Sequence, residues 1–523
     1  MTTLSTLLRY YAIRNPDRLA LSVDGQDFTY RELLARVQAV AQLLRTRLSG
    51  QAPRVGILAS RSWAAYAGIL ATSAVGGTYV PIHPDCPEDR ILRILNAASL
   101  DALIVDDRGI KALSPTVASS CPLHVLAPAN DSSLTLHSNG CGIVILGKDS
   151  LPAPSPDFAP VDPDPRRLAY IMFTSGTTGS PKGVMISEGN VANFLAAMQQ
   201  HFPFAPTDRI PQTFELTFDL SVWAMLAAWG SGASLHVVPA GQLMGPSHFI
   251  REKQITVWLS VPSTIACMRS LKMLTPGAFP SLRYSGFCGE PLPAASAEAW
   301  HSAAPNSVIA NVYGPTEATI ACMSEMYSDP PVITKERGIV AIGKTFAGMK
   351  AAILDSSNRF LAAGETGELA LSGSQIADGY LNEPARTAAR FPIIDGEVWY
   401  LTGDLAYQDA AGIFHHLGRT DHQIKVLGNR VELEEVEAHL RDVCETESVA
   451  AVPWPIESGS ARGIVAFVAG STVSPALIRK GMQLRVPTYM VPSQVRVLDD
   501  LPHNTSGKTD RKALAAILSG GSP

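Results

Sequence analysis

The chain has 523 residues, 46% of them hydrophobic and 17% charged, with a formal net charge of −5 at pH 7. This length exceeds what one hydrophobic core usually holds, so two or more domains are expected. The slightly acidic balance gives no electrostatic reason to expect a nucleic-acid partner. Seven cysteines, scattered without paired-ligand spacing, argue against a disulfide framework or a zinc site and favour a reducing compartment.

Membrane insertion and secretion are not expected. Residues 1–17 lack a basic region followed by an apolar run, so no signal peptide is visible. The stretches 62–84 and 220–250 carry no charge, but neither holds eighteen consecutive apolar residues, so both fit a buried core better than a membrane span. The sequence therefore predicts a cytoplasmic protein.

The N-terminal third of the chain shows no functional motif and is expected to be structural. Thr29 and Glu32 have the spacing of a capping box, and the apolar residues that follow repeat at helical period. Short buried strands are expected at 54–60 and 102–105. The segment 128–164 is rich in Ser, Pro, Asn and Asp, which predicts a surface excursion.

A loop rich in glycine and hydroxyl groups, residues 174–183, follows this segment and is called the glycine-rich loop below. Residues 170–173 form an apolar strand, and a helical pattern begins at Asn190. Backbone N–H groups, hydroxyls and one ammonium around such a loop suit a polyphosphate. It is not a Walker loop, because Lys182 is followed by Gly183 rather than Ser or Thr. A plain hairpin turn is the alternative.

Strands and helices alternate regularly from residue 255. Strands are expected at 255–261, 282–287 and 307–312, with helices at 262–274 and 294–301, which indicates a mostly parallel, doubly wound sheet. Ligands bind such sheets beyond the carboxyl ends of the strands. The turns 288–291 and 311–317 lie at two of these ends, so we expect them beside the glycine-rich loop.

The composition shifts after about residue 345 toward short strands and turns. A boundary is expected at 418–421, and a helix at 434–443 with later strands forms a small α+β unit. The predicted fold class is therefore α/β. A large N-terminal region, 1–419, has doubly wound sheets and a small β-rich subdomain, and a small α+β domain, 420–523, follows.

These motifs, from Phe28-Thr29-Tyr30 to Lys508, resemble those of the ANL superfamily of adenylate-forming enzymes, in the same order and over nearly the whole chain. Within it, the chain is similar to amino-acid adenylation domains of the nonribosomal peptide synthetase type. The discriminating residue is Asp219, whose counterpart in those domains binds the α-ammonium of the substrate. A carboxylate inside an apolar stretch needs such a partner. The alternative is an ordinary N-cap, since Ser221 and Val222 could open a helix.

The resemblance implies two half-reactions, with ATP and Mg²⁺ as cofactors. A carboxylate attacks the α-phosphate to give an aminoacyl-adenylate and pyrophosphate, and a phosphopantetheine thiol then takes the acyl group. Lys508, Thr174 and Glu317 are the implied catalytic residues, with Glu317 as the magnesium ligand. The implied nucleotide-binding residues are Thr174, Ser175, Gly176, Thr177, Thr178, Lys182, Gly289, Glu290, Pro291, Asn311, Tyr313, Gly314, Thr316, Asp404, Arg419 and Lys508.

Tyr313 is expected to stack on adenine, with Asn311 as the partner of its amino group. Asp404 should bind the ribose hydroxyls, and Thr316 should reach the α-phosphate. The resemblance also places a hinge at Asp421, about which the C-terminal domain rotates between the half-reactions. That rotation would withdraw Lys508 and bring the loop around Gly428 to the site.

The family's pocket positions predict the substrate. They fall on Asp219, Leu220, Trp223, Ser260, Gly286, Cys288, Val312, Ile320 and Ala321. Apart from Asp219 the lining is apolar or small, so a small neutral, alanine-like amino acid is expected, with alanine, 2-aminobutyrate, serine and proline all open. Parts of the chain are similar to D-alanine–D-alanyl carrier protein ligases. Trp223 replaces a Met of that family and fills space, whereas Gly286 is expected to leave extra room.

No carrier-domain motif follows Lys508, so a separate carrier protein bearing phosphopantetheine is the expected partner. Two other functions stay open. An acyl- or aryl-CoA synthetase of the same superfamily is disfavoured by Asp219. A catalytically silent binding or scaffold homologue is disfavoured by the complete set of nucleotide motifs.

Overall fold

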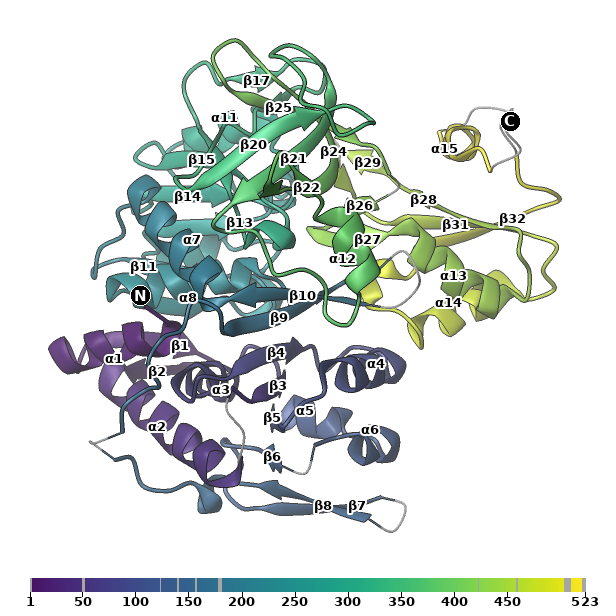
Figure 1. The fold of residues 1–523 in the computed structure, drawn as a ribbon. Coiled ribbons are helices and arrows are strands. Elements are labelled where there is room, and N and C mark those ends of the chain that lie inside the picture. Colours follow the sequence, from purple (N-terminus) through teal and green to yellow (C-terminus); the bar gives the residue numbers. More distant parts are fainter. Residues whose placement is uncertain are drawn as a thin grey trace.

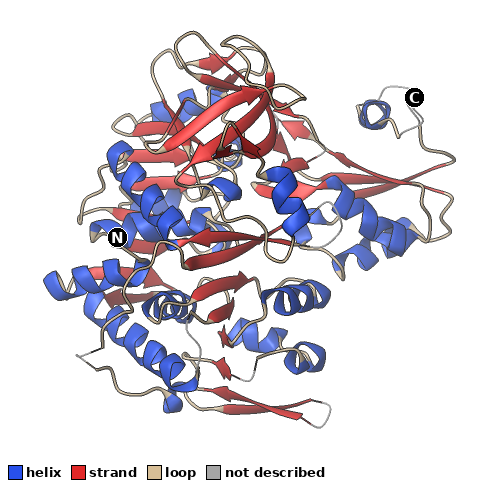
Figure 2. Ribbon diagram, in the orientation of Figure 1, coloured by secondary structure: helices blue, strands red, loops and turns tan. Residues whose placement is uncertain are grey.

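The computed structural model describes residues 2–48, 52–122, 124–138, 141–155, 158–176, 181–421, 423–457, 460–502 and 509–519. Helices cover the faces of several sheets, and the C-terminal elements stand to one side of the rest (Figure 1, Figure 2). This arrangement confirms the predicted α/β class. None of the described helices is both long and apolar enough to cross a membrane.

The largest sheet has the strand order β10-β9-β4-β3-β5-β6-β8-β7 and is parallel except at its two outermost strands. Its strands are β3 (Arg54–Leu58), β4 (Thr78–Ile82), β5 (Ala102–Val105), β6 (His124–Leu126), β7 (Leu134–Ser138), β8 (Cys141–Leu146), β9 (Leu168–Thr174) and β10 (Lys182–Ser187). The helices between them are α3 (Trp63–Ala74), α4 (Glu88–Ala98), α5 (Asp107–Ala112) and α6 (Pro115–Ser119).

One expectation for this region is wrong. The segment 128–164 is only partly a surface excursion, because β7 and β8 form a hairpin and β8 pairs in parallel with β6. Ile145 on β8 is buried among apolar side chains of the sheet. The strand β8 was not predicted because the residues around the hairpin are polar and because β8 is stabilised by pairing with β6 and β7.

A second sheet has the order β11-β12-β1-β2. Its strands are β1 (Leu19–Val23), β2 (Gln26–Thr29), β11 (Arg209–Gln212) and β12 (Ser234–Val237), with α1 (Leu4–Arg14), α2 (Tyr30–Arg47) and α8 (Leu220–Ser231) around it. The helix α7 (Glu188–His201) packs against β9 and β10 of the first sheet and against α8. The predicted capping box is confirmed: the Thr29 hydroxyl accepts from the Glu32 N–H, and the Glu32 carboxylate accepts from the Thr29 N–H. Every residue of α8 is buried, so the first part of the uncharged stretch 220–250 is core, whereas Pro239–Gly241 and Met244 are exposed.

A third sheet, β13-β14-β15-β16-β19, carries the predicted alternation of strands and helices. It consists of β13 (Val257–Ser260), β14 (Tyr284–Phe287), β15 (Val308–Tyr313), β16 (Met323–Met326) and β19 (Lys344–Thr345), with α9 (Ser247–Glu252), α10 (Pro262–Ser270) and α11 (Ala294–Ala303). The first three strands are parallel, so their carboxyl ends meet at one edge. Both turns predicted to lie beside the glycine-rich loop start from this edge.

The β-rich part that follows is an antiparallel sheet, β20-β21-β24-β25. Its strands are β20 (Met349–Leu354), β21 (Gly367–Gly373), β24 (Tyr400–Gln408) and β25 (Phe414–Arg419), accompanied by α12 (Pro384–Arg390) and the short pairs β17 (Ile333–Thr334) with β18 (Ile339–Val340) and β22 (Ile393–Ile394) with β23 (Glu397–Val398).

The C-terminal elements have hydrophobic clusters of their own, built from residues 424–518. The elements are β26 (Gln423–Val426), β27 (Asn429–Glu432), α13 (Leu433–Cys444), β28 (Val449–Pro453), β29 (Ile456–Glu457), β30 (Ser460–Ala461), β31 (Ile464–Ala469), α14 (Pro475–Gln483), β32 (Gln494–Leu498) and α15 (Arg511–Leu518). The β26–β27 hairpin points from this unit toward the larger one (Figure 1). The boundary at residue 420 and the rotation about it stay predictions.

Candidate active site

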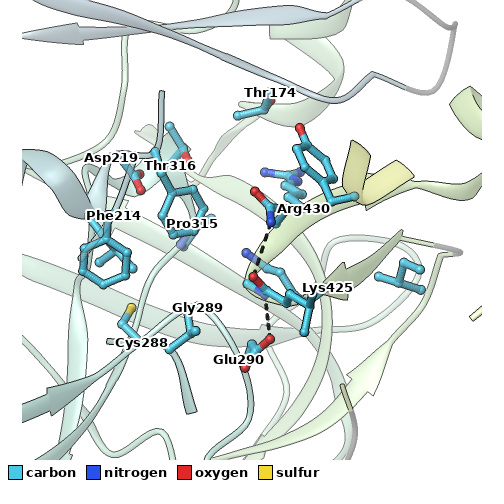
Figure 3. A pocket seen from close by; sticks show the side chains of 18 of the residues that line it. Thr174, Phe214, Asp219, Cys288, Gly289, Glu290, Pro315, Thr316, Lys425 and Arg430 are labelled. Atoms are coloured by element: carbon cyan, nitrogen blue, oxygen red, sulfur yellow. Dashed lines mark hydrogen bonds between the residues drawn. The ribbon is translucent and has the colours of Figure 1, made fainter. Parts of the chain in front are cut away.

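A cavity of about 770 Å³ lies where the third sheet, the end of β9 and the β26–β27 hairpin meet. In Figure 3, Asp219 and Cys288 lie on one side of it, with Lys425 and Arg430 facing them and Thr174 above. The cavity is therefore bounded by parts of the chain that are far apart in sequence.

The glycine-rich loop leaves β9 at the edge of this cavity. Thr174 and Ser175 line it, and the Thr174 hydroxyl is buried without a hydrogen-bond partner among the described residues. Lys182 opens β10 opposite Thr174, so the antiparallel pair holds the ammonium next to the loop. Burial lowers the pKa of Lys182 to about 8, and the nearby charge of Arg430 acts in the same direction. Thr177 and Thr178 lie outside the described residues.

Glu317 sits in a short 3-10 turn, η3 (Thr316–Ala318), and is completely buried. Its two carboxylate oxygens accept from Arg430 Nη1 at 3.1 and 2.9 Å. Tyr380 donates its hydroxyl at 2.8 Å, and Lys182 Nζ lies 3.5 Å away. Burial alone would raise the pKa of Glu317, but the Arg430 and Lys182 cations hold it well below its ordinary value. This carboxylate is ionised and placed to bind a cation.

Asn311 and Tyr313 at the end of β15 form another wall of the cavity. The Asn311 Nδ2 donates to the carbonyls of Val340 and Ala341 at 3.1 and 2.8 Å, which leaves Oδ1 as the atom that can accept from a ligand amine. Gly314 is required here, because a Cβ would lie 2.4 Å from the Ala321 Cα.

Asp404 on β24 lies beside this wall. It accepts from the Tyr313 hydroxyl and, at 2.7 Å, from Arg419 Nη1. Burial would raise the pKa of Asp404, but Arg419 and His416 hold it below its ordinary value. Pairing across β24 and β25 aligns Asp404 with Arg419, so the two predicted ribose-side residues are brought together by strand register.

Asp219 precedes α8 and is 5% exposed. It occupies the N-cap position, but its side chain makes no capping hydrogen bond, and Oδ2 has no partner among the described residues. Burial raises the pKa of Asp219 to about 6, against a hydrogen bond from Thr316 and the charge of Lys425. The N-cap alternative therefore does not account for this carboxylate, which lines the cavity instead.

The predicted pocket residues separate into two groups. Those that line the cavity are Asp219, Leu220, Ser260, Cys288, Val312 and Ile320. Trp223 and Gly286 pack against each other behind them, and a Cβ on Gly286 would lie 2.7 Å from the Trp223 Cη2. The expectation that Gly286 leaves extra room is therefore wrong, because the indole fills it. Ala321 instead packs against Gly314.

The turn 289–291 lines the cavity, and Glu290 holds two loops there. Its carboxylate accepts from the Ser263 N–H at 2.8 Å and from the Gly428 N–H at 2.6 Å. Glu290 thus joins the third sheet to the β26–β27 hairpin. Nucleotide contacts of Gly289, Glu290 and Pro291 stay predictions.

The sequence reasoning gave no role to Lys425, Arg430 or Tyr380. Lys425 lines the cavity near Asp219 and Cys288, and burial lowers its pKa. A signal was present, since basic residues at 425 and 430 flank the glycine at 428. Sequence alone does not show that this hairpin docks on a site 200 residues earlier.

Two further predictions concern the C-terminal part. Lys508 lies outside the described residues. Asp421, the predicted hinge, accepts from Arg419 Nε at 2.6 Å, so the residue before the C-terminal hairpin is tied to β25. Its role as a hinge stays a prediction.

The residues present fit a magnesium–nucleotide complex. Glu317 supplies the oxygen ligand that a hard cation prefers, and the partnerless Thr174 hydroxyl suits a phosphate oxygen. Arg430 and Lys182 both lie beside Glu317, so the surroundings of this carboxylate accommodate positively charged groups.

Comparison with known proteins gives a consistent result. Residues 8–381 match the family model described as AMP-binding enzyme. The chain is 33% identical over 519 residues to tyrocidine synthase 2 of Brevibacillus parabrevis, covering 98% of this chain and 13% of that protein. It is 32% identical over 526 residues to malpinin synthetase of Mortierella alpina, covering 96% of this chain and 6% of that protein. The chain thus spans only a small part of the length of these relatives.

Solved structures match over the full length. The Vibrio cholerae adenylation domain AlmE, solved with glycyl-adenosine-5'-phosphate, superposes with a TM-score of 0.87 at 32% identity, covering 99% of this chain and 98% of that one. IdnL7 superposes with a TM-score of 0.71 at 32% identity, covering 99% of both chains.

Proposed function

Because the chain belongs to the family of AMP-binding enzymes, we propose that it activates a small neutral amino acid as its adenylate. ATP would supply the adenylyl group and pyrophosphate would leave. The aminoacyl group would then pass to the phosphopantetheine thiol of a carrier protein.

The observation that carries this proposal is the Asp219 carboxylate. It is buried, lines the cavity and has an oxygen without a partner among the described residues. A buried carboxylate with an unmade hydrogen bond costs free energy, which an incoming ammonium would recover. An acyl or aryl acid has no ammonium to offer, so this residue favours amino acids over the substrates of CoA synthetases.

The nucleotide would lie along the wall formed by Asn311, Tyr313 and Asp404. Asn311 Oδ1 would accept from the adenine amino group, and Asp404 would accept from the ribose hydroxyls. Thr174 and Lys182 would bind the terminal phosphates, and Thr316 the α-phosphate. Positioning of this kind, rather than a covalent enzyme nucleophile, would lower the barrier.

Magnesium bound at Glu317 would neutralise the phosphate charge and orient the leaving pyrophosphate. Glu317 is ionised and preceded by Thr316, so the metal ligand and the α-phosphate contact would come from adjacent residues of η3.

The residues around the pocket support a small side chain. Trp223 packs behind the lining residues, against Gly286, and is held by Phe194 and Phe202, whose ring centroids lie 6.4 and 5.9 Å from it. Cys288 and Ile320 offer no charge to pair with, and burial raises the pKa of Cys288 to about 12, so it stays a neutral thiol. AlmE, whose structure holds a glycyl adenylate, is consistent with this size.

ATP–pyrophosphate exchange against D- and L-amino acids tests the proposal. We expect exchange with alanine, glycine or 2-aminobutyrate and none with lysine or glutamate. The deamino acid propionate is the matched control for alanine, because it lacks only the ammonium. Equal exchange with propionate would favour an acyl-CoA synthetase, and no exchange from folded protein would favour a catalytically silent homologue.

A further inference from the structure

Two tyrosine hydroxyls are buried behind the cavity without a hydrogen-bond partner among the described residues. They belong to Tyr79 on β4 and Tyr170 on β9, which are 2% and 0% exposed. The strands β4 and β9 are neighbours (Figure 1), and Tyr79 pairs with Tyr170 across them, with ring centroids 5.5 Å apart. A buried tyrosine hydroxyl normally finds a partner, so a pair of them without one requires an explanation.

Both side chains lie on a face of the sheet that leads to the cavity. Residues two apart on a strand share a face. Met172 follows Tyr170 on this face and Pro81 follows Tyr79, and Met172 and Pro81 both line the cavity. The two tyrosines are not among the described lining residues, so they lie one step behind the wall. Their hydroxyls therefore do not contact a substrate directly.

Asp219 is the charged group that acts on both hydroxyls. Burial raises the pKa of Tyr79 and of Tyr170, and the negative charge of Asp219 raises each of them further. Asp219 is itself buried, and its Oδ2 has no partner among the described residues. Two donors and one acceptor without partners thus share one buried region at the wall of the cavity.

A bound water can satisfy all three groups. A buried water usually makes about three hydrogen bonds, and it makes them to polar groups that the protein leaves unpaired. The two hydroxyls and Asp219 Oδ2 supply that number. A carboxylate oxygen has two lone pairs, so Oδ2 can accept from a water on the sheet side and from an ammonium on the cavity side at once.

We propose that Tyr79 and Tyr170 are positioning residues for Asp219, which hold one water against Oδ2. The water accepts from the two hydroxyls and donates to Oδ2, so it favours the ionised carboxylate and fixes its orientation. The tyrosines act through Asp219 and touch no substrate. That Asp219 binds an ammonium rests on the proposed function, whereas the water site depends only on the three buried groups.

Asp219 is also surrounded by groups from other elements. These are the Thr316 hydroxyl and Glu317 of η3, Lys425 of β26, the Cys288 thiol after β14 and the Leu220 N–H of α8. All of them are present in each tyrosine variant below, so a difference between those variants reports the tyrosines.

Infrared difference spectroscopy of the full chain tests the proposal without substrate. The C=O stretch of the protonated Asp219 carboxyl is the band that wild type gains on acidification and that Asp219→Asn lacks. We expect the midpoint of this band to rise by about half a pH unit in Tyr79→Phe or Tyr170→Phe and by about one unit in the double variant, because the ionised form loses a donated hydrogen bond.

Tyr66→Phe is the matched control. The Tyr66 side chain on α3 is 0% exposed, but the charges that act on its hydroxyl are those of Arg61, Glu215 and Asp24. Its infrared midpoint should equal that of wild type. Equal midpoints in wild type and in all the folded tyrosine variants would overturn the proposal.

ATP–pyrophosphate exchange separates a positioning role from a packing role. Under the proposed function, the double variant should lower kcat/KM for alanine about fivefold at pH 6 and leave it unchanged above about pH 8, because only the ionised carboxylate attracts the ammonium. The same loss at every pH would indicate packing alone and would contradict the inference.

A crystal structure of wild type decides the question even if a variant does not fold. We expect electron density for one water within about 3.2 Å of Tyr79 Oη, Tyr170 Oη and Asp219 Oδ2. The absence of density between these atoms at high resolution would rule the water site out. Neither the infrared nor the crystallographic measurement uses a substrate, so a failed exchange assay would count against the proposed function alone.

Discussion

Two buried carboxylates of the candidate site, Asp219 in the cavity lining and Glu317 beneath it in η3, have opposite pKa shifts. Glu317 contacts Arg430 and Lys182, and its pKa is held low, whereas Asp219 lacks a close ion-pair partner among the described residues and its pKa rises to about 6. The first is kept ionised by the cations around it. The second, under the proposed function, would gain its cation from the substrate.

The raised pKa of Asp219 predicts a pH dependence. Only the ionised form attracts an ammonium. The value of kcat/KM for the amino acid should therefore reach its maximum well above pH 6 and fall about tenfold for each pH unit below pH 6. Asp219→Asn should lower kcat/KM by about 10²–10³ at pH 8 and remove this acidic limb. Pyrophosphate exchange from pH 5 to 8.5 measures both. The KM for ATP serves as a control, and an identical acidic limb in the variant would contradict the assignment.

The contact between Trp223 and Gly286 predicts a coupled change in specificity. Gly286→Ala places a methyl 2.7 Å from the indole, so the ring must move toward the cavity. We expect at least a tenfold loss of kcat/KM for alanine and about 1–3 kcal/mol lower free energy of unfolding.

Trp223→Leu should instead raise the ratio of kcat/KM for valine to kcat/KM for alanine about tenfold over wild type. Combined with Gly286→Ala, it should restore the activity that the methyl group removes. Gly241→Ala is the control, since a Cβ there meets nothing within 4 Å. ATP–pyrophosphate exchange with Gly286→Ala, Trp223→Leu, the double variant and Gly241→Ala measures kcat/KM for each amino acid. If the effects of the two site substitutions simply add in the double variant, the two residues are not coupled, and the predicted consequence of their contact is contradicted.

At the scale of elements, the turn of the β26–β27 hairpin is shaped to pack closely against Val261 and Glu290. Gly428 at its turn has φ +84, and a Cβ there would lie 2.6 Å from the Val261 Cγ1. Its N–H also donates to Glu290. Glycine meets two needs here, a left-handed backbone and a close approach to the residue that precedes α10.

Gly428→Ala should therefore disturb docking more than folding. We expect aminoacyl transfer to a phosphopantetheine thiol to slow at least tenfold, while adenylate formation changes by less than about threefold. Gly470→Ala is the matched control, because φ there is +69 but the nearest atom is 3.7 Å away. Rapid-quench assays of each half-reaction measure the difference. Equal effects of the two substitutions would show that backbone strain, and not the contact with Val261, is responsible.

At the scale of the whole molecule, two lysines of the C-terminal part are expected to serve different half-reactions. Lys425 lines the cavity when the hairpin is docked. Lys508 is implied by resemblance to the family as the cation that meets the substrate carboxylate and the α-phosphate during adenylation.

Lys508→Ala should lower the rate of adenylate formation by about 10²–10³. Lys425→Ala should chiefly lower transfer, because its ammonium reaches the cavity only when the hairpin is docked. Single-turnover assays of adenylate formation and of transfer from preformed adenylate separate them. The same loss in both steps for both variants would contradict this division of labour.

Much of the site was predictable residue by residue. Asn311, Tyr313 and Glu317 were expected beside the glycine-rich loop because parallel strands end at one edge, and the structure places them there. The β7–β8 hairpin was missed, because short strands in polar surroundings are stabilised by partners that local sequence does not reveal.

The sequence by itself determined the alternation of strands and helices and the capped helix α2, because these depend on local periodicity and side-chain chemistry. Its resemblance to a family added candidate groups for nucleotide, metal and amine, whose roles stay predictions. Only the tertiary structure decided that the Trp223 ring fills the room beside Gly286, that the Asp219 side chain makes no capping hydrogen bond, and that Arg430 and Glu435 contact Glu317 and the glycine-rich loop. These facts depend on which distant surfaces pack together, and packing is set by the whole chain rather than by any one segment of it.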